Sequence, residues 1–399
     1  MKEFKKVVLA YSGGLDTSIS VRWLLENKCE EVVAVAVDLG QKEDLEAARQ
    51  KALKVGASQA FVIDAREEFV KDFVWPSLKA NAKYEFDYPL ATAIGRPLIA
   101  KVLNDIAVKT DADTVAHGCT AKGNDQVRFE VSWQALNPKL KVIAPPREWG
   151  ELCDRNKAID YAQAHNIPVT STKKSPYSID LNLWGRSVEC GILEDPWVEP
   201  PEDAYALTNA LEKTPDKAQY IEIEFDKGIP IALDGKKYNG IDLIDELNSI
   251  AGLHGIGRID QIENRLVGIK SREIYEAPAA TVLLRAHREL EFLVNTKDVM
   301  HFKQGIDQKY AELIYNGLWF SPLRQALDGF IEETQKRVSG TIRFKLYKGN
   351  CIVVGRKSEL SLYDHGLATY DQGDEFDHTA SPGFMKIFGL GIKTFYSKR

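Results

Sequence analysis

The sequence contains few cysteines, no long apolar run and no excess of positive charge, and each absence excludes a class of protein. Only five of its 399 residues are cysteine, and no two of them form a C-x-x-C pair. An odd, scattered set argues against a disulfide scaffold and a thiol-ligated zinc site, so a reducing, cytoplasmic location is expected. No apolar run approaches the ~20 residues that a transmembrane helix needs, and no membrane contact is expected.

The charge balance is slightly negative, which argues against a nucleic-acid partner. Lys and Arg total 52 against 58 Asp and Glu, giving a net charge of −6. Affinity for nucleic acid depends on basic side chains that neutralise phosphates, and this chain has no surplus of them. The charged fraction of 28% and the hydrophobic fraction of 44% are ordinary for a globular protein, and the length suggests two or three domains.

The first part of the chain alternates short β-branched runs with helical stretches, which is the pattern of a parallel sheet. The apolar runs predict strands at 7–11, 32–37, 60–63, 114–116, 142–144 and 167–169. Helices are expected between them, for example over 18–26. The sequence therefore predicts an α/β domain over residues 1–168.

The pattern changes after this domain. Residues 171–201 are rich in turn formers and lack a clear period, which indicates either a linker or a long functional loop. Beyond them, 220–234 and 340–356 alternate as antiparallel hairpins, with helical segments between the two. We expect a second, α+β domain over 169–360 and a tail over 361–399 that is too short to form its own core.

The strongest local signal is the string AYSGGLDTS at residues 10–18, which follows a predicted strand and opens a helix. Two glycines let the backbone turn sharply and approach a ligand closely. The hydroxyls of Ser12, Thr17 and Ser18 and the free N–H groups at the helix start all lie beside the turn. This combination predicts a phosphate-binding loop.

The string departs from the two common nucleotide motifs. A Walker A loop requires a lysine after its second glycine, and a Rossmann turn requires G-x-G-x-x-G; neither order is present. One interpretation is an ordinary tight turn with a serine that caps the helix. The other is a resemblance to the pyrophosphate loop of the N-type ATP pyrophosphatases, which cleave ATP between its α and β phosphates and adenylate a substrate. That resemblance implies that Asp16 binds metal or holds the loop.

A second string, AHGCTAKGNDQVRFE at residues 116–130, also follows a predicted strand. Its glycines have the spacing of a P-loop, but Asn124 and Asp125 stand where lysine and a hydroxyl residue are required, which argues against γ-phosphate transfer. Asn124 and Arg128 are four residues apart and share a helical face. The set suits a zwitterion, with Arg128 or a hydroxyl for the carboxylate and Asp125 for the ammonium. The alternative is a loop with a capping Asn or Asp and a surface Arg.

Together these strings resemble the argininosuccinate synthase family, and the resemblance covers most of the chain. Further matching stretches are GQKED at 40–44, FVWP at 73–76, KVIAP at 141–145, GILE at 191–194, GIGRID at 255–260 and ENRLVGIKSREIYE at 263–276. The resemblance implies an adenine nucleotide alpha hydrolase-like fold for the first domain. It implies a synthetase and multimerisation domain for the second, and a tail that packs on neighbouring subunits of a homotetramer.

The resemblance also implies a reaction. The ureido oxygen of citrulline attacks the α-phosphorus of ATP and releases pyrophosphate, and the aspartate amine then displaces AMP from citrullyl-AMP to give argininosuccinate. The expected co-substrate is ATP with Mg²⁺, and no metal site made by the protein alone is expected. No residue is assigned as a general acid or base, and Ser12 and Asp16 are the groups expected to assist adenylation.

The binding residues implied by the family fall into three groups. The ATP positions correspond to Ala10, Tyr11, Ser12, Gly13, Gly14, Leu15, Asp16, Thr17, Ser18, Val37 and Gly118. The aspartate positions correspond to Thr120, Asn124 and Asp125. The citrulline positions correspond to Tyr88, Asn124, Arg128, Ser178, Ser187, Glu263 and Tyr275. Ala93 stands where some relatives have a serine, and Thr92 or a water is expected to replace that contact.

Without the resemblance, several of these residues have ordinary structural interpretations. Tyr88 and Tyr275 read as buried aromatics with satisfied hydroxyls, and Glu263 as a partner for a nearby arginine. Ser178 and Ser187 lie in the turn-rich stretch, where serine usually bonds the backbone. In the second string, His117 and Cys119 are expected to pack rather than react.

Two other functions compete with this interpretation. One is a different pyrophosphatase-loop enzyme, such as an NAD or GMP synthetase or a tRNA-thiolating enzyme. The sequence shows no glutaminase nucleophile motif, no paired reactive cysteines and no basic surface for RNA. The other is a nucleotide-binding module without catalysis, which leaves the polar groups of a large second domain unexplained.

Overall fold

The computed structural model describes residues 2–168 and 177–398. Its first unit is a five-stranded sheet in the order β3-β2-β1-β4-β5, with every pair parallel. The strands are β1 (Phe4–Ala10), β2 (Cys29–Asp38), β3 (Gln59–Asp64), β4 (Thr114–Ala116) and β5 (Lys141–Ile143). The predicted α/β class is confirmed, and the strands lie close to their expected positions. Of the expected strand at 167–169, residues 167 and 168 are coil and 169 lies outside the described residues.

This sheet is buried on both faces, as its continuous β-branched runs require. Val8 and Val33 pack into one hydrophobic core, whereas Val7, Leu9 and Val32 pack into another. Because successive side chains of a strand point to opposite faces, the two cores lie on the two sides of the sheet.

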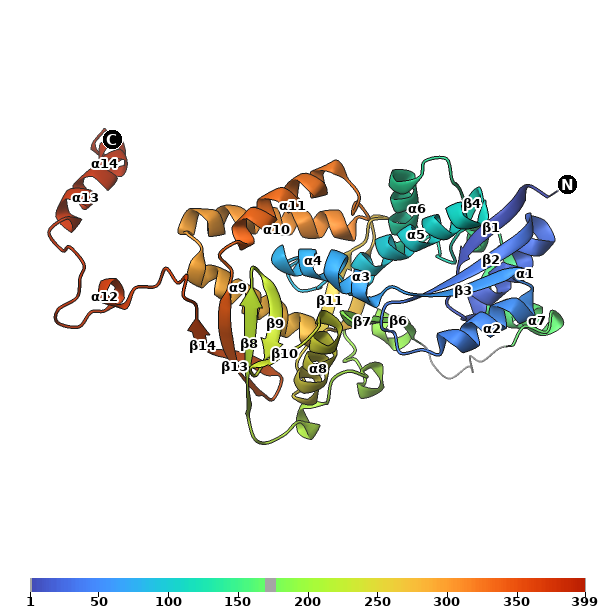
Figure 1. Cartoon of the computed structure of the whole chain (residues 1–399), viewed down its shortest axis with the longest axis horizontal. Helices are drawn as coiled ribbons and strands as arrows, with labels where there is room; N and C mark the ends of the chain where they lie inside the picture. The colour runs from blue at the N-terminus through green and yellow to red at the C-terminus, as the bar shows by residue number, and fades with distance from the viewer. Residues whose placement is uncertain (1, 169–176, 399) are drawn as a thin grey trace.

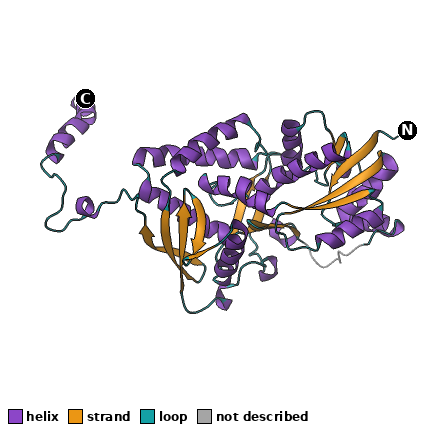
Figure 2. Cartoon of the chain, viewed as in Figure 1, coloured by secondary structure: helices purple, strands orange, loops and turns teal. Residues whose placement is uncertain are grey.

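The helices of this unit cover both faces of the sheet (Figure 2). They are α1 (Leu15–Asn27), α2 (Leu45–Val55), α3 (Arg66–Phe69), α4 (Trp75–Lys79), α5 (Ala91–Thr110), α6 (Asp125–Leu136) and α7 (Arg155–Ala164), with a π-helical turn at Val70–Val74. The chain adds β2 and β3 on one side of β1 and then β4 and β5 on the other. The strand order therefore reverses between β1 and β4, and ligands of such sheets bind at that crevice, beyond the carboxyl ends of the strands.

The second unit contains two antiparallel sheets. One is ordered β11-β12-β7-β6, from β6 (Ser178–Asn182), β7 (Gly185–Glu189), β11 (Arg258–Asn264) and β12 (Lys270–Glu276). The other is ordered β10-β9-β8-β13-β14, from β8 (Gln219–Asp226), β9 (Ile229–Leu233), β10 (Lys236–Lys237), β13 (Gly340–Tyr347) and β14 (Asn350–Lys357). Both expected hairpins are present. The β6–β7 hairpin is an addition, because residues 171–201 showed no strand period.

Of the helices that follow, α8 (Gly240–Leu253) and α9 (Pro278–Val294) pack with these sheets, whereas α10 (Lys297–Tyr315) and α11 (Pro322–Gln335) pack on each other and on α5 and α4. After β14 the chain leaves the body as an extended arm, drawn in red in Figure 1, with α12 (His365–Ala368), α13 (Ser381–Phe388) and α14 (Leu390–Ser397). Ile387 and Phe388 of the arm are 72% and 77% exposed. Within the described part of the chain, no helix has the length and apolarity to cross a membrane.

A buried ionic cluster joins the first unit to α9 and α10. The ammonium of Lys303, which is fully buried, donates to the Lys79 carbonyl at 2.8 Å and to Asp307 at 2.7 Å, and it lies 3.1 Å from Glu291. Asn81 donates to both Glu291 and Asp307, at 2.7 and 3.0 Å. Burial raises the pKa of Asp307 to about 7, against the opposing effect of Lys303.

The Asp307→Asn variant should make stability less dependent on pH. The unfolded chain ionises Asp307 near pH ~3.9. Between about pH 4 and pH 7 the folded chain holds a proton that the unfolded chain has lost, so this residue's contribution to stability falls as pH rises through that window. Asparagine cannot ionise. The melting temperature of the variant, relative to the original protein, should therefore rise from pH 5 to pH 7, and a constant difference would contradict this account.

Candidate active site

A cavity of about 560 Å³ opens at the carboxyl edge of the parallel sheet and extends to the β6–β7–β12–β11 sheet. Residues from both predicted strings line it, as do residues from the second unit. The predicted residues that line it are Ala10, Tyr11, Ser12, Gly14, Leu15, Asp16, Thr17, Val37, Tyr88, Gly118, Thr120, Asn124, Asp125, Arg128, Ser178, Ser187, Glu263 and Tyr275. Thus side chains that are far apart in the sequence meet in one cavity.

The other two predicted residues, Gly13 and Ser18, lie behind the cavity wall and shape the first loop. Gly13 has a φ of +77°, and a Cβ there would lie 2.9 Å from the Cβ of Ala48, so only glycine fits. The Ser18 hydroxyl is fully buried, donates to the Gly14 carbonyl at 2.7 Å and is hydrogen-bonded to the Tyr11 hydroxyl at 3.0 Å.

The start of α1 faces the cavity. Its N-cap residue is Gly14, which has no side chain, so no capping side chain accepts from the first backbone N–H groups of the helix. The hydroxyls of Ser12 and Thr17 lie 3.2 Å apart at this point, and both residues line the cavity. Backbone N–H groups, hydroxyls and the positive end of a helix dipole together form an anion cradle. Asp16 lies beside it, and burial raises the pKa of this carboxyl.

In the second loop, His117 and Cys119 have structural environments. The His117 ring is fully buried, lies 3.2 Å from Glu130 and accepts from the Cys119 backbone N–H at 3.2 Å. Burial raises the pKa of the Cys119 thiol, so the nucleophilic thiolate form is disfavoured. Neither side chain is placed as a reactive group.

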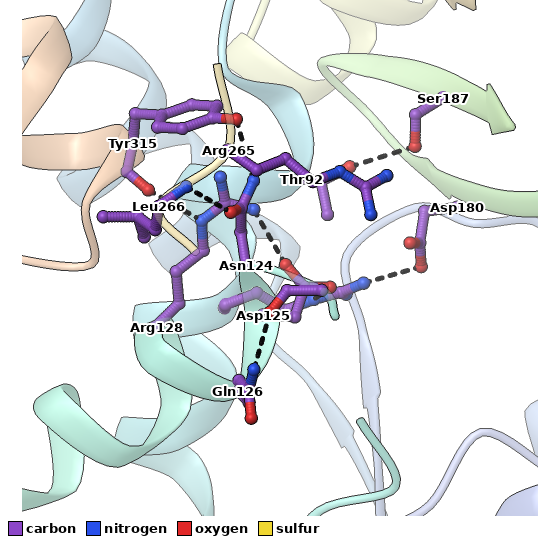
Figure 3. Close-up of polar contacts among 12 residues, drawn as sticks. Thr92, Asn124, Asp125, Gln126, Arg128, Asp180, Ser187, Arg265, Leu266 and Tyr315 are labelled. Atoms are coloured by element: carbon purple, nitrogen blue, oxygen red, sulfur yellow. Dashed lines mark hydrogen bonds and ion pairs between the residues drawn. The ribbon is translucent and has the colours of Figure 1, made fainter. Parts of the chain in front are cut away.

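Asp125 lies between two arginines at the start of α6 (Figure 3). One carboxylate oxygen accepts from Arg96 Nε at 2.7 Å and the other accepts from Arg128 Nη1 at 2.8 Å. Burial alone would raise the pKa of Asp125, but the two guanidinium groups outweigh burial and lower it. The carboxylate is therefore charged at neutral pH.

Several of the residues predicted to bind citrulline form a cluster around Glu263, which is only 2% exposed. Its carboxylate accepts from the Tyr275 hydroxyl at 2.7 Å and from the Tyr315 hydroxyl at 2.6 Å. The Tyr315 hydroxyl in turn accepts from the Asn124 amide at 2.8 Å. Burial raises the pKa of Glu263, and the tyrosine hydroxyls limit that rise. The ring of Tyr275 stacks on that of Tyr88 at 3.9 Å.

Among the residues of this site that were not predicted from the sequence are Arg96, Arg265 and Tyr315; Tyr315 does not line the cavity but contacts Asn124 and Glu263, which do. Arg96 and Arg265 line the cavity, and Arg265 pairs with Glu273 and Glu189. Tyr315 ends α10 and lies under the guanidinium of Arg128, 4.9 Å from ring centre to carbon. No motif marks Arg96 or Tyr315, because both act through contacts that are distant in the sequence. Arg265 lies within the matching stretch at 263–276 but was not expected to line the site.

At the position of the missing serine, Ala93 is fully buried and Thr92 lines the cavity. The Thr92 hydroxyl lies 3.3 Å from that of Ser187. The replacement of the serine contact by Thr92 remains a prediction.

Comparison with known proteins agrees with this arrangement. The family model described as "Arginosuccinate synthase N-terminal HUP domain" matches residues 6–168, and the one for the C-terminal domain of that family matches residues 177–395. The chain belongs to the argininosuccinate synthase family. The members of this family are ligases. This agrees with the expectation, drawn from the first loop, of an enzyme that adenylates its substrate.

Individual argininosuccinate synthases match over nearly their full length. The protein of Bacillus pumilus is 60% identical over 393 residues, which cover 98% of this chain and 97% of the relative. That of Gloeobacter violaceus is 59% identical over 396 residues, or 99% of each chain. That of Chlorobium phaeobacteroides is 57% identical over 391 residues, covering 98% and 97%.

The Tyr315→Phe variant should weaken the use of citrulline while leaving the use of ATP nearly unchanged. It removes the one hydroxyl that joins Asn124 to Glu263. A lost hydrogen bond to a buried carboxylate corresponds to about a tenfold rise in KM for citrulline. The KM for ATP should change by less than about twofold, since Tyr315 is remote from the first loop.

The matched control is Tyr310→Phe. The Tyr310 hydroxyl is also bonded to a carboxylate, that of Asp328 at 2.7 Å. Asp328 does not line the cavity, whereas both partners of the Tyr315 hydroxyl, Asn124 and Glu263, do. Equal citrulline defects in the two variants, or none in Tyr315→Phe, would remove Tyr315 from the site.

Proposed function

We propose that this chain joins citrulline to aspartate with the cleavage of ATP to AMP and pyrophosphate. The observation that carries the proposal is the single cavity that holds an anion cradle on one side and a cluster suited to amino acids on the other. The ureido oxygen of citrulline attacks the α-phosphorus, and pyrophosphate leaves. The aspartate amine then attacks the activated carbon, and AMP leaves with the former ureido oxygen.

In this proposal ATP lies along the first loop. Residues 10–18, Val37 and Gly118 hold it, with the hydroxyls of Ser12 and Thr17 and the start of α1 directed at its phosphates. These groups would stabilise the charge that develops on the leaving pyrophosphate. The two amino acids bind across from it, citrulline among Tyr88, Arg128, Ser178, Ser187, Glu263 and Tyr275 with Asn124 shared, and aspartate at Thr120, Asn124 and Asp125.

Alignment of three reactants supplies much of the rate in such a reaction, and well-oriented groups are worth ~7–11 kcal/mol. The site fits this need, since its aromatic and ionic contacts fix side chains from six elements before any substrate enters. No general base is assigned, and Ser12 and Asp16 remain the groups proposed to assist adenylation.

Mg²⁺ belongs to the proposal as a companion of ATP. The described residues that line the cavity include more carboxylates than arginines, so these carboxylates would repel a triphosphate that carries no metal ion. Among them, Asp16 lies nearest the anion cradle. Among the described residues no three His, Cys, Asp or Glu side chains are grouped to hold a metal ion. The ion would therefore be bound mainly by the phosphates, with Asp16 as the side chain placed to contact it, and would neutralise their charge.

We also propose that the chain is divided into three functional parts. Residues 1–168 would bind the nucleotide, residues 169–360 would complete the amino-acid sites, and the arm over 361–399 would join four copies into a tetramer. The free state of all five cysteines in the structure supports a cytoplasmic location.

The first half-reaction can be measured alone. With citrulline present and aspartate absent, the protein should exchange labelled pyrophosphate into ATP, because adenylation is reversible. Exchange should disappear when citrulline is omitted. Formation of ADP and phosphate in the complete reaction would contradict the proposal.

Deletion of the arm from Gly366 onward should break the assembly and spare the nucleotide unit. The arm exposes apolar side chains that its own body does not cover, among them Ile387, Phe388 and Ile392. Burial of such side chains contributes about 25 cal/mol per Å², and exposed apolar patches of this kind mark interfaces. Light scattering should show a loss of tetramer, with ATP-induced thermal stabilisation retained. A folded tetramer without the arm would contradict the assignment.

A further inference from the structure

Arg96 connects the two halves of the site. It lies on α5, and its guanidinium donates from Nε to Asp125 at 2.7 Å and from Nη2 to Asp180 at 2.7 Å. Asp125 starts α6 in the first unit, and Asp180 lies on β6 in the second. Arg96 itself is 18% exposed at the side chain and lines the cavity.

The contact with Asp180 is one of three hydrogen bonds between described residues that seat the β6–β7 hairpin on α5; in another, the Asn182 amide donates to the Ala91 carbonyl at 2.8 Å. Asp180 pairs in register with Ser187 of β7, so the two side chains lie side by side on one face. Ser187 contacts Thr92, which is four residues before Arg96 and on the same face of α5. Two neighbouring residues of the helix face therefore meet two paired residues of the hairpin.

This hairpin carries both serines of the citrulline side. Ser178 lies two residues before Asp180 on β6, and Ser187 is the cross-strand partner of Asp180. Of the three hydrogen bonds with α5, Thr92–Ser187 at 3.3 Å and Asn182–Ala91 at 2.8 Å are neutral, whereas Arg96–Asp180 at 2.7 Å is a charged pair. Charge-assisted hydrogen bonds are roughly twice as strong as neutral ones, so Arg96 supplies the strongest of the three.

We infer that Arg96 is a positioning residue that sets the distance between the citrulline side and the aspartate side of the cavity. It acts through Asp180 on the hairpin and through Asp125 on the start of α6. The bridge needs a guanidinium, because its planar fork directs separate N–H groups at two carboxylates, whereas the single ammonium of a lysine cannot reproduce both contacts. This inference rests on the proposed function.

The test compares Asp180→Asn with Arg96→Lys in the citrulline-dependent exchange and in the complete reaction. Asp180→Asn removes the charge from the hairpin contact alone and should raise the citrulline KM by about tenfold, the value of one charge-assisted bond. Arg96→Lys should raise the KM values for both citrulline and aspartate. In both variants the KM for ATP and the melting temperature should stay close to those of the original protein.

The double variant separates positioning from general destabilisation. If both residues act through one bridge, Arg96→Lys with Asp180→Asn should raise the citrulline KM no further than Arg96→Lys alone. The matched control is Arg66→Lys. Arg66 also joins two aspartates, Asp38 at 3.5 Å and Asp64 at 2.6 Å, and is not among the residues lining the cavity, so its KM values should not change.

The inference would be overturned if the two substitutions had additive effects on the citrulline KM, or if Asp180→Asn left that KM unchanged. In either case, exchange by the original protein would still support the proposed function. Equal defects in Arg66→Lys would also overturn it. Absence of exchange in the original protein would overturn the proposed function, and the inference with it.

Discussion

The site is organised by one partly buried negative charge, the carboxylate of Asp125, which is held between the guanidinium groups of Arg96 and Arg128. An unpaired charge at this depth would cost several kcal/mol, so each of the three groups needs the others. Arg96 extends the set to β6 through Asp180, and Arg128 extends it to α10 through the Tyr315 carbonyl at 3.0 Å. The positions of the residues proposed to bind both amino acids thus depend on a single ionic set.

This dependence changes what the separate residues can be expected to do. The sequence suggested that Asp125 meets only the aspartate ammonium, so that Asp125→Asn would spare the first half-reaction. In the structure Asp125 also fixes Arg128, which is assigned to citrulline. Loss of its charge would leave the buried Arg128 guanidinium and the partly buried Arg96 guanidinium without the carboxylate between them, and we expect both half-reactions to suffer.

The sequence was sufficient for the parts of the fold that depend on local pattern. Apolar runs located the strands of the parallel sheet, and the glycines and hydroxyls at 10–18 located the anion cradle, because each signal lies within one short segment. The β6–β7 hairpin was missed because it is short, its outer strand is partly exposed and turn-forming residues surround it. Arg96 and Tyr315 were missed because their roles come from partners far along the chain; Tyr315 is 191 residues from Asn124.

The central claim is that citrulline and ATP react directly within one cavity, and the path of one oxygen atom tests it. Citrulline labelled with heavy oxygen in its ureido group should be converted with ATP and unlabelled aspartate, and the products analysed by mass spectrometry. If the ureido oxygen attacks the α-phosphorus and later leaves with AMP, the label should appear in the phosphate of AMP. Label found in pyrophosphate or released to water, with AMP unlabelled, would contradict the account.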